Sequence, residues 1–394
     1  MALDVDDFPA LLRTFKGSRR KGHPDTYRML NSIGNRFLSL YKITFQPTDL
    51  DRAIICYDTS VKLTPDTDLV TMVDSVRGAH HSKASRFAHL AEAFLLRYES
   101  RQQLSDLESG IASYRSAVEL SPDNHKDKLK RLSSLAGAFE LLFKQSANIS
   151  DLDSSIYFHQ LAVNDTPDGD VEKAGRLSNL GSALGMRFAR LGKMPDLQES
   201  IPFHQKSVDL TPDGSPFRPK RLSNLGEALK ARFDHGGQVL DLQASVRFFQ
   251  AAAGAIPTDS SRQPLYLSNL GNALHARFER LGDVVDINNA IVSHRKAGEL
   301  SPGNHPGKPA SFSNLGNAYE SRFESFGNIS DIESSVKYHN IAVELMPDDS
   351  PKKALYLCNP NQKGTVLRNY LAGLSDKKLK IKFRNFVRKI WLVK

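Results

Sequence analysis

Asparagine side chains that could hold a ligand recur along this chain at a fixed interval of 45 residues. Side-chain amides donate and accept hydrogen bonds together, so a row of them could grip the backbone of an extended peptide. The alternative is that these amides join neighbouring helices and touch no ligand. The sequence leaves both interpretations open. The positions are Asn179, Asn224, Asn269 and Asn314, with Asn272 and Asn317 three residues after the last two.

A row of arginines has the same period, and each member directly precedes an aromatic residue. Guanidinium groups bind carboxylates through two parallel hydrogen bonds, so the row could hold an acidic peptide or a carboxylate terminus. We favour the alternative that they pair with acidic groups of an adjoining helix or are simply solvated. The members are Arg97, Arg187, Arg232, Arg277 and Arg322.

Residues suited to catalysis or metal binding are few. Four histidines share one position of the 45-residue period, at His159, His204, His294 and His339, but other intervals place Tyr57, Tyr114 and Phe249 there. Exchange with aromatic residues indicates packing. Cys358 could pair with a distant histidine as a nucleophile, and we do not favour this because the sequence around it departs from the period. Phosphate-loop, HExxH and CxxC motifs are absent from the sequence. We therefore predict no catalytic residues, no cofactor and no metal.

The period itself indicates the architecture that positions these residues. A glycine or alanine marks each interval, and every step is 45 residues except the first, which is 57. A proline closes each interval with the same spacing, from Pro65 to Pro347. Such a period is typical of a solenoid, in which each repeat buries its apolar face against its neighbours. The marking residues are Gly34, Ala91, Ala136, Gly181, Gly226, Gly271 and Gly316.

Two helical patterns are visible in each interval. In the sixth, Leu267, Leu270, Leu274 and Phe278 follow one another by three or four residues, which places them on one helix face. The second pattern begins at an aspartate, which we expect to accept the free N–H groups of a helix N-terminus. Ser105 with Glu108 and Ser330 with Glu333 have capping-box spacing. The aspartates are Asp49, Asp106, Asp151, Asp196, Asp241, Asp286 and Asp331.

These residues resemble the tetratricopeptide repeat (TPR) family. The family pattern of bulky apolar, Leu-Gly, bulky, small, aromatic, small and Pro matches Leu267, Leu270, Gly271, Leu274, Ala290, His294, Ala297 and Pro302. The resemblance implies an all-α, right-handed solenoid of antiparallel helix pairs, whose first helices line a concave surface that binds peptides. More narrowly, the chain resembles fungal arrays that often precede a caspase-like CHAT domain. The alternative function is therefore the sensor part of a truncated TPR-CHAT protease.

The repeats are expected to occupy residues 22–349, with a 12-residue insertion within 67–85. Residues 1–21 carry one apolar stripe and are predicted to form a cap helix. Residues 350–394 contain a broken eighth repeat, in which Pro360 stands inside the expected first helix, followed by a basic tail. The tail could associate with a membrane, a partner's groove or nucleic acid, or it could be an unselected end.

Composition agrees with an interaction protein of the cytoplasm. The net charge is +9, and residues 363–394 hold ten Lys and Arg with one Asp, so the repeats themselves are close to neutral. Two cysteines far apart favour a reducing compartment. We predict a protein or peptide partner and do not expect nucleic acid or membrane as partners of the repeats.

Overall fold

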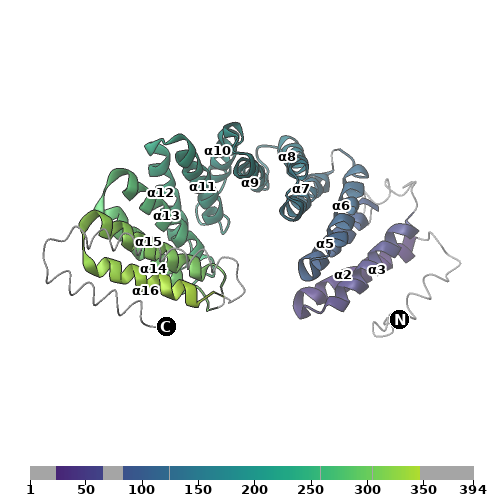
Figure 1. The fold of residues 1–394 in the computed structure, drawn as a ribbon. Helices are drawn as coiled ribbons and strands as arrows, with labels where there is room; N and C mark the ends of the chain where they lie inside the picture. The colour runs from purple at the N-terminus through teal and green to yellow at the C-terminus, as the bar shows by residue number, and fades with distance from the viewer. Residues whose placement is uncertain (1–23, 65–82, 124, 258, 304, 347–394) are drawn as a thin grey trace. The chain divides into compact units, whose positions relative to one another are not determined.

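The structure is a computed structural model that describes residues 24–64, 83–123, 125–257, 259–303 and 305–346. Within these ranges the regular elements are α-helices, and consecutive helices form antiparallel pairs (Figure 1). We call each pair a repeat and number the repeats 1 to 7. The first helices are α2 (Pro24–Thr44), α5 (Lys83–Arg101), α7 (Lys126–Ser146), α9 (Lys173–Leu191), α11 (Arg218–Gly236), α13 (Gln263–Leu281) and α15 (Lys308–Phe326). The second helices are α3 (Pro47–Leu63), α6 (Leu104–Glu119), α8 (Ile149–Asn164), α10 (Met194–Asp209), α12 (Val239–Gly254), α14 (Val284–Leu300) and α16 (Ile329–Glu344).

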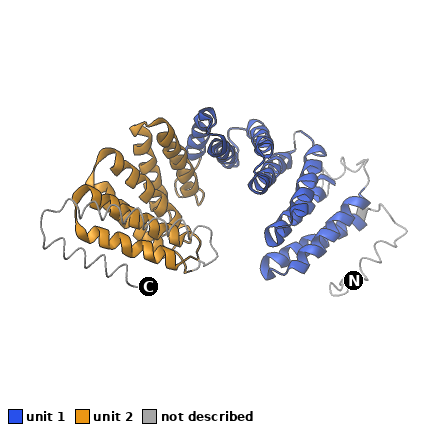
Figure 2. Ribbon diagram, viewed as in Figure 1, with its two compact units in different colours: residues 1–210 blue, residues 211–394 orange. Residues whose placement is uncertain are grey.

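The chain divides into two compact units (Figure 2). Unit 1 comprises residues 1–210 with repeats 1–4, and unit 2 comprises residues 211–394 with repeats 5–7. Inside each unit, a second helix packs against its own first helix and against the first helix of the next repeat. In unit 2 the first helices α11, α13 and α15 also contact one another in order. Their exposed residues form what we call the first-helix face, and those of α12, α14 and α16 form the second-helix face.

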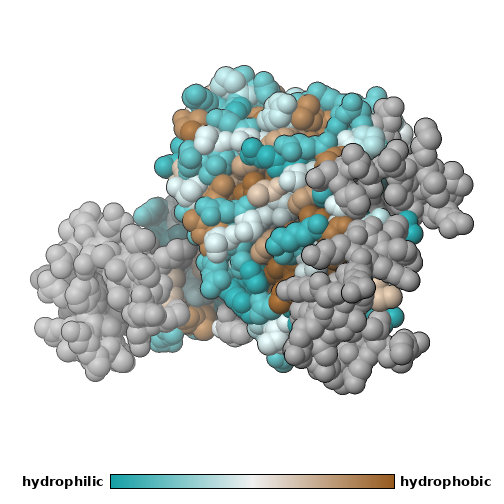
Figure 3. All heavy atoms as spheres, turned by 90° about the vertical axis from the view of Figure 1, so that its right-hand side faces the viewer, coloured by the Kyte–Doolittle hydropathy of each residue, from teal (hydrophilic) through white to brown (hydrophobic). Residues whose placement is uncertain are grey.

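The predicted all-α solenoid of helix pairs is confirmed. The proposed domain boundaries remain a prediction: the cap helix at 1–21, most of the insertion within 67–85, and the broken repeat and tail at 350–394 lie outside the described residues. Figure 3 shows hydrophilic residues interleaved with shorter hydrophobic stripes over one face of the molecule, as expected for helices that bury one side.

Each first helix ends in a residue with a left-handed backbone conformation, which starts the turn to the second helix. In repeat 6 this residue is Gly282, with φ of 75°, and its N–H donates to the carbonyl of Phe278 over 2.7 Å. Glycine adopts this conformation without a Cβ penalty, which explains why it recurs at this point. Repeats 1, 2 and 3 use Phe45, Gln102 and Ala147 instead.

In the repeats marked by a glycine, the core contains a contact between that glycine and the ring on the second helix. A Cβ placed on Gly271 would lie 2.6 Å from Cε1 of His294, and one on Gly226 would lie 3.0 Å from Cε1 of Phe249. The absence of a side chain at these glycines therefore leaves space that a ring of the second helix fills. The prediction that the histidines are packing residues is confirmed for His204, His294 and His339.

The two helices of each repeat pack closely at the small residue that precedes the closing proline. Every residue at this position is fully buried, including Ser60, Ser207 and Ala297. In repeats 1 and 4 the serine hydroxyls donate to first-helix carbonyls, Ser60 to Tyr27 and Ser207 to Ala174, each over 2.6 Å.

The aspartates of the second helices do not cap them, which corrects the sequence analysis. In α14 the N-cap is Asp283, whose side chain accepts from the N–H of Val285, and Asp286 lies in the first turn. In α8 and α16 the N-caps are Asn148 and Asn328. Ser105 and Ser330 lie inside their helices, so the proposed capping boxes do not form. The aspartates recur at one position of each repeat because they pair with side chains of the first helix.

Candidate functional site

The arginine row and the aspartate row form one set of paired charges. Arg277 on α13 donates from Nε to Oδ2 of Asp286 over 2.7 Å and from Nη2 to Oδ1 over 2.5 Å. Asp286 is almost fully buried, and Arg277 is about three-quarters buried, with 24% of its side chain exposed. The same two-bond pairing joins Arg97 to Asp106, Arg187 to Asp196, Arg232 to Asp241 and Arg322 to Asp331.

Three of these arginines also reach the preceding repeat. Arg187 donates to Asp153 on α8 over 2.8 Å, and Arg322 donates to Asn288 on α14 over 2.6 Å. Arg97 likewise donates to Asp51 on α3 over 2.8 Å. The hydrogen bonds that the guanidinium groups donate to the aspartates outweigh partial desolvation and raise the pKa of each of these arginines. The pairing with adjoining helices that we favoured is therefore present. A role in binding an acidic ligand stays a prediction.

Repeats 1 and 3 have leucine at the arginine position. In these repeats a hydroxyl group donates the hydrogen bond to the aspartate instead. Thr44 donates to Asp49 over 3.3 Å, and Ser146 donates to Asp151 over 2.7 Å. Both hydroxyls lie five residues before the aspartate, where the arginine-bearing repeats have Arg101, Leu191, Gly236, Leu281 and Phe326. The aspartate thus has a side-chain donor in every repeat, including repeat 3, where Asp151 is only half-buried.

A second set of arginines, which sequence reasoning missed, joins consecutive repeats through the hydroxyl before the closing proline. Arg86 donates to Thr64 over 3.2 Å, Arg131 to Ser121 over 2.5 Å and Arg176 to Thr166 over 3.1 Å. These three arginines are buried. Burial lowers the pKa of Arg131. The signal was present, because Arg131 and Arg176 each lie ten residues after the Ser or Thr of a Ser-Pro or Thr-Pro pair, and Arg86 lies 22 residues after Thr64, a difference equal to the 12-residue insertion.

The asparagines of unit 2 lie on the first-helix face, where they bridge neighbouring first helices. Asn269 on α13 donates from Nδ2 to Oε1 of Glu227 on α11 over 2.8 Å, with a longer bond of 3.3 Å to Ser223. Asn314 on α15 makes the equivalent bond to Oδ1 of Asn272 on α13 over 3.0 Å. Both bonds join residues that are 42 positions apart in the sequence. The same bridge therefore recurs at equivalent positions of successive repeats. The bridging alternative is thus observed for these residues, and ligand binding stays untested.

The other predicted asparagines have different surroundings. Asn224 on α11 and Asn317 on α15 are half-buried on the first helices of unit 2. Asn179 is exposed on α9 of unit 1. The structure therefore brings Asn269, Asn272 and Asn314 together, and it leaves Asn179 in the other unit.

A polar pocket of about 440 Å³ opens on the first-helix face between α11 and α13. Asn269 and Asn272 line it, with the ring of Phe249 from α12 between the two first helices. His275 donates to or accepts from Ser321 on α15 over 2.7 Å, and burial lowers its pKa. The remaining lining residues are Glu227, Lys230, Ala231, Asp234, Ala276 and Glu279.

Unit 1 has a pocket at the equivalent place, between the first helices α5 and α7 of repeats 2 and 3. Its volume is about 280 Å³, and Tyr114 of α6 lines it as Phe249 does in unit 2. Glu92 and Ser134 hold the positions of Glu227 and Asn269, each 135 residues earlier. A pocket between adjacent first helices is thus a recurring product of the repeat.

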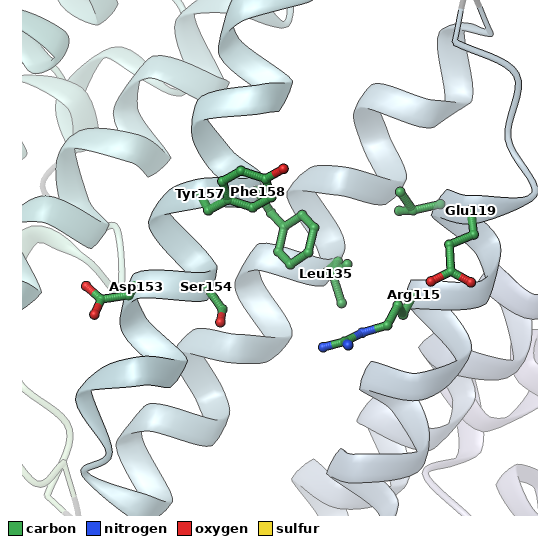
Figure 4. Close-up of a pocket in the computed structure, with 8 residues that line it drawn as sticks. Arg115, Glu119, Leu135, Asp153, Ser154, Tyr157 and Phe158 are labelled. Carbon is green, nitrogen blue, oxygen red and sulfur yellow. The ribbon is translucent and has the colours of Figure 1, made fainter.

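A further pocket of about 450 Å³ lies between the second helices α6 and α8. Figure 4 shows Arg115 and Phe158 extending into the space between these helices, with Leu135 of α7 behind them. At the edge of this pocket, Tyr157 is 59% exposed. The ring of the neighbouring Phe158 stacks on the ring of Phe139. This pocket has no equivalent among the residues singled out from the sequence.

The described residues offer no metal site, because they contain no group of three or more suitable His, Cys, Asp or Glu side chains. Burial lowers the pKa of His204 to about 4 and that of His294 to about 3. Burial also raises the pKa of the Cys56 thiol to about 12, so it is protonated at neutral pH. Cys358 lies outside the described residues. Among the described helices, none combines the length and apolar composition needed to cross a membrane.

Comparison with known proteins returns structures of similar repeats. No protein-family model matches the chain, and no curated protein does. The chain is similar to YrrB, described as a TPR protein with an unusual peptide-binding site, with 14% identity, coverage of 62% of this chain and 97% of that one, and a TM-score of 0.38. It is similar to BtubC from P. vanneervenii, with 17% identity, coverage of 62% and 94%, and a TM-score of 0.45. The C-terminal part of a TPR repeat-containing protein from Cytophaga hutchinsonii shows 13% identity, coverage of 83% and 99%, and a TM-score of 0.39.

The helix pairs themselves decide the architecture, since the Leu-Gly, ring and small positions of the TPR pattern meet at their packing points. The described part of the chain is an α-solenoid of TPR-like helix pairs. Its TPR-like repeats have long helices, with first helices such as α13 of 19 residues and second helices such as α12 of 16 residues. The relation to arrays that precede a CHAT domain stays a prediction.

Proposed function

We propose that this TPR-like protein is a non-enzymatic interaction scaffold, and that the first-helix face of unit 2 binds an extended segment of a partner protein. The observation that carries the proposal is the pocket between α11 and α13, where Asn269 and Asn272 line an open polar space. The surface of contact would extend to Asn314 and Asn317 on α15 and to Asn224 on α11. Asn179 would contribute separately from unit 1.

The amide atoms that remain available suit a peptide backbone. Asn269 uses its Nδ2 for the bridge to Glu227, so its Oδ1 has no hydrogen-bond partner in the described part of the chain. Asn272 accepts from Asn314 through Oδ1, and its Nδ2 is left as a donor. The acceptor and the donor come from residues three apart on α13, whose Cβ atoms lie about 5–6 Å from each other on a helix surface. An extended chain rises about 3.3 Å per residue, so backbone groups on one side of it recur about every 6.6 Å.

The bridges hold these amides in place before a ligand arrives. A side chain that is already fixed loses less conformational freedom on binding, which improves affinity. The bridging observed in the structure and the binding proposed here are therefore compatible: one amide atom orients the side chain, and the other serves the ligand.

No observation on the described residues favours the alternatives of a protease sensor or of tail-mediated association with nucleic acid or membrane. The basic tail lies outside those residues.

The proposal is tested by selecting peptides from a random 12-residue display library on the full chain. The selected peptides are then measured against N269A/N272A/N314A and against the control Q243A/Q250A/N340A. The control removes three exposed amides from α12 and α16 on the second-helix face. We expect binding to weaken at least tenfold in the first variant and to be unchanged in the control, with both variants retaining the helical circular dichroism of the parent. Loss of binding in the control alone would place the site on the other face and overturn the proposal.

A further inference from the structure

The pocket between α11 and α13 carries an excess of negative charge. Three carboxylates line it, from Glu227, Asp234 and Glu279, against the single ammonium group of Lys230. Lys230 is held by Asp234 through bonds of 2.8 and 3.0 Å. Glu279 lies 3.5 Å from Nε2 of His275. Burial lowers the pKa of His275, and burial raises the pKa of Glu227. With His275 counted as neutral, three carboxylates against one ammonium group give a formal charge of −2.

Glu227 and Glu279 therefore have no cationic partner among the described residues. Glu227 accepts hydrogen bonds from the uncharged groups of Asn269 and Ser223, over 2.8 and 3.2 Å. These bonds orient the carboxylate and do not neutralise it. Glu279 is exposed at the edge of the pocket. A cation that enters the pocket would donate a charge-assisted hydrogen bond to either carboxylate.

The pocket also has apolar lining, from Ala231 on α11 and Ala276 on α13. The ring of Phe249 lies beneath it, packed on Gly226 with 1% of the residue exposed. Lysine and arginine bury their methylene stems on apolar surface while their charged ends stay in polar surroundings. Apolar lining next to carboxylates thus suits a long basic side chain better than it suits a small cation or an acidic group.

The equivalent pocket in unit 1 shows that this charge is not a general property of the repeats. Glu92 holds the position of Glu227, and it is paired with Lys42 over 2.9 Å. That pocket is also lined by His89, Lys130 and Arg131, with Asp127 as its only other carboxylate. The excess of acid is therefore specific to unit 2.

We infer that the pocket between α11 and α13 receives a lysine or arginine side chain of the bound segment, so that the partner is a basic peptide. The segment's backbone would contact Asn269 and Asn272, and its basic side chain would enter the pocket lined by Glu227 and Glu279. This inference rests on the proposed function, because it assigns the chemistry of the segment that the first-helix face binds.

The test uses the full chain and the peptides selected from the random 12-residue library. We expect these peptides to be enriched in lysine or arginine at one shared position. Replacing that residue with norleucine or citrulline should weaken binding at least tenfold. The variant E227Q/E279Q should cause a similar loss, because glutamine keeps the size and the hydrogen bonds of each side chain. The control E299Q/E333Q removes the same charge from exposed positions of α14 and α16 and should leave binding unchanged.

The outcomes separate this inference from the proposed function. Peptides that depend on the three asparagines but show no basic residue, or that are insensitive to E227Q/E279Q, would overturn the inference and leave the proposed function standing. Equal losses in E227Q/E279Q and the control would reveal unspecific attraction and would also overturn it. If no selected peptide depends on the asparagines, both fail together.

Discussion

Arg277 on α13 and Asp286 on α14 are joined by two parallel hydrogen bonds of 2.7 and 2.5 Å. Four other repeats contain the same pair, and the two that lack the arginine supply a hydroxyl instead. The pair fixes the first helix to the start of the second, close to the turn between them. The aspartates are therefore part of the connection between helices.

We expect D286A to lower the free energy of unfolding by about 1–2 kcal/mol, since hydrogen bonds to charged groups contribute about 1.5–3 kcal/mol and Arg277 stays partly exposed to water. Urea unfolding followed by circular dichroism measures this loss. The double-mutant cycle with R277A should give a positive coupling energy. A coupling of zero within error would show that the pair does not connect the helices energetically.

Substituting alanine at Gly271 should destabilise the protein, although alanine is the better helix former. The new Cβ would lie 2.6 Å from the ring of His294. Overpacking of this kind costs about 1–3 kcal/mol, which exceeds the helix-propensity gain of about 1 kcal/mol. Gly137 on α7 is the matched control, because a Cβ there meets no atom within 4 Å. G137A should therefore raise the thermal midpoint and G271A should lower it. Stabilisation by both would contradict the packing described here.

The buried histidine of repeat 6 should make the protein less stable as the pH is lowered. The pKa of His294 is about 3 in the folded protein because burial disfavours the charged form, and it is about 6.5 in the unfolded chain. Stability from the neutral ring is complete above pH 6.5 and is lost as the pH falls toward 3, since the unfolded chain takes up the proton first. Each pH unit below 6.5 lowers the free energy of unfolding by up to about 1.4 kcal/mol.

The variant H294F separates this effect from other acid effects. Phenylalanine fits the site in repeat 5, where Phe249 packs on Gly226. Both ring nitrogens of His294 are buried without a hydrogen-bond partner, so H294F should also be more stable at pH 7. Urea midpoints measured from pH 7.5 to 4 should decline less in H294F than in the parent. Parallel declines would exclude His294 as the cause.

Cys56 should be unreactive in the folded protein. Its side chain is fully buried, and burial raises the thiol pKa to about 12, so almost no thiolate is present at pH 8. In a C358S background, Ellman's reagent should label Cys56 only after repeat 1 opens, and the labelling rate should increase with urea. Rapid labelling without denaturant would mean that repeat 1 is not closed as the structure shows.

Much of the fold could be predicted because the repeat period exposes which positions pack. The exchange of His294 with Phe249 and Tyr57 at one position indicated a packing ring, and the structure places these rings against glycines. What the ring touches could not be inferred, because the sequence gives no distance between the two helices. For the same reason the aspartates were assigned to helix caps. Their location near a helix start was correct, and their partner was the arginine nine residues earlier.

The candidate site could be predicted only in part. Spacing placed the asparagines on one helix face, and the structure adds that Asn269 and Asn314 bridge to the preceding first helix. The pocket itself was missed, since it depends on Glu227 and Glu279 from different helices together with a ring from a third. The periodicity of one helix does not indicate which residues of different helices line a common pocket.

The most direct test of the central claim is photo-crosslinking from the ligand. A selected 12-residue peptide carrying a diazirine side chain is bound to the full, unmodified chain and irradiated, and the labelled residues are identified by mass spectrometry. We predict labels on α11 and α13, around Ala231 and Ala276, and on α15. Labels confined to α12, α14 and α16 would contradict the assignment of binding to the first-helix face.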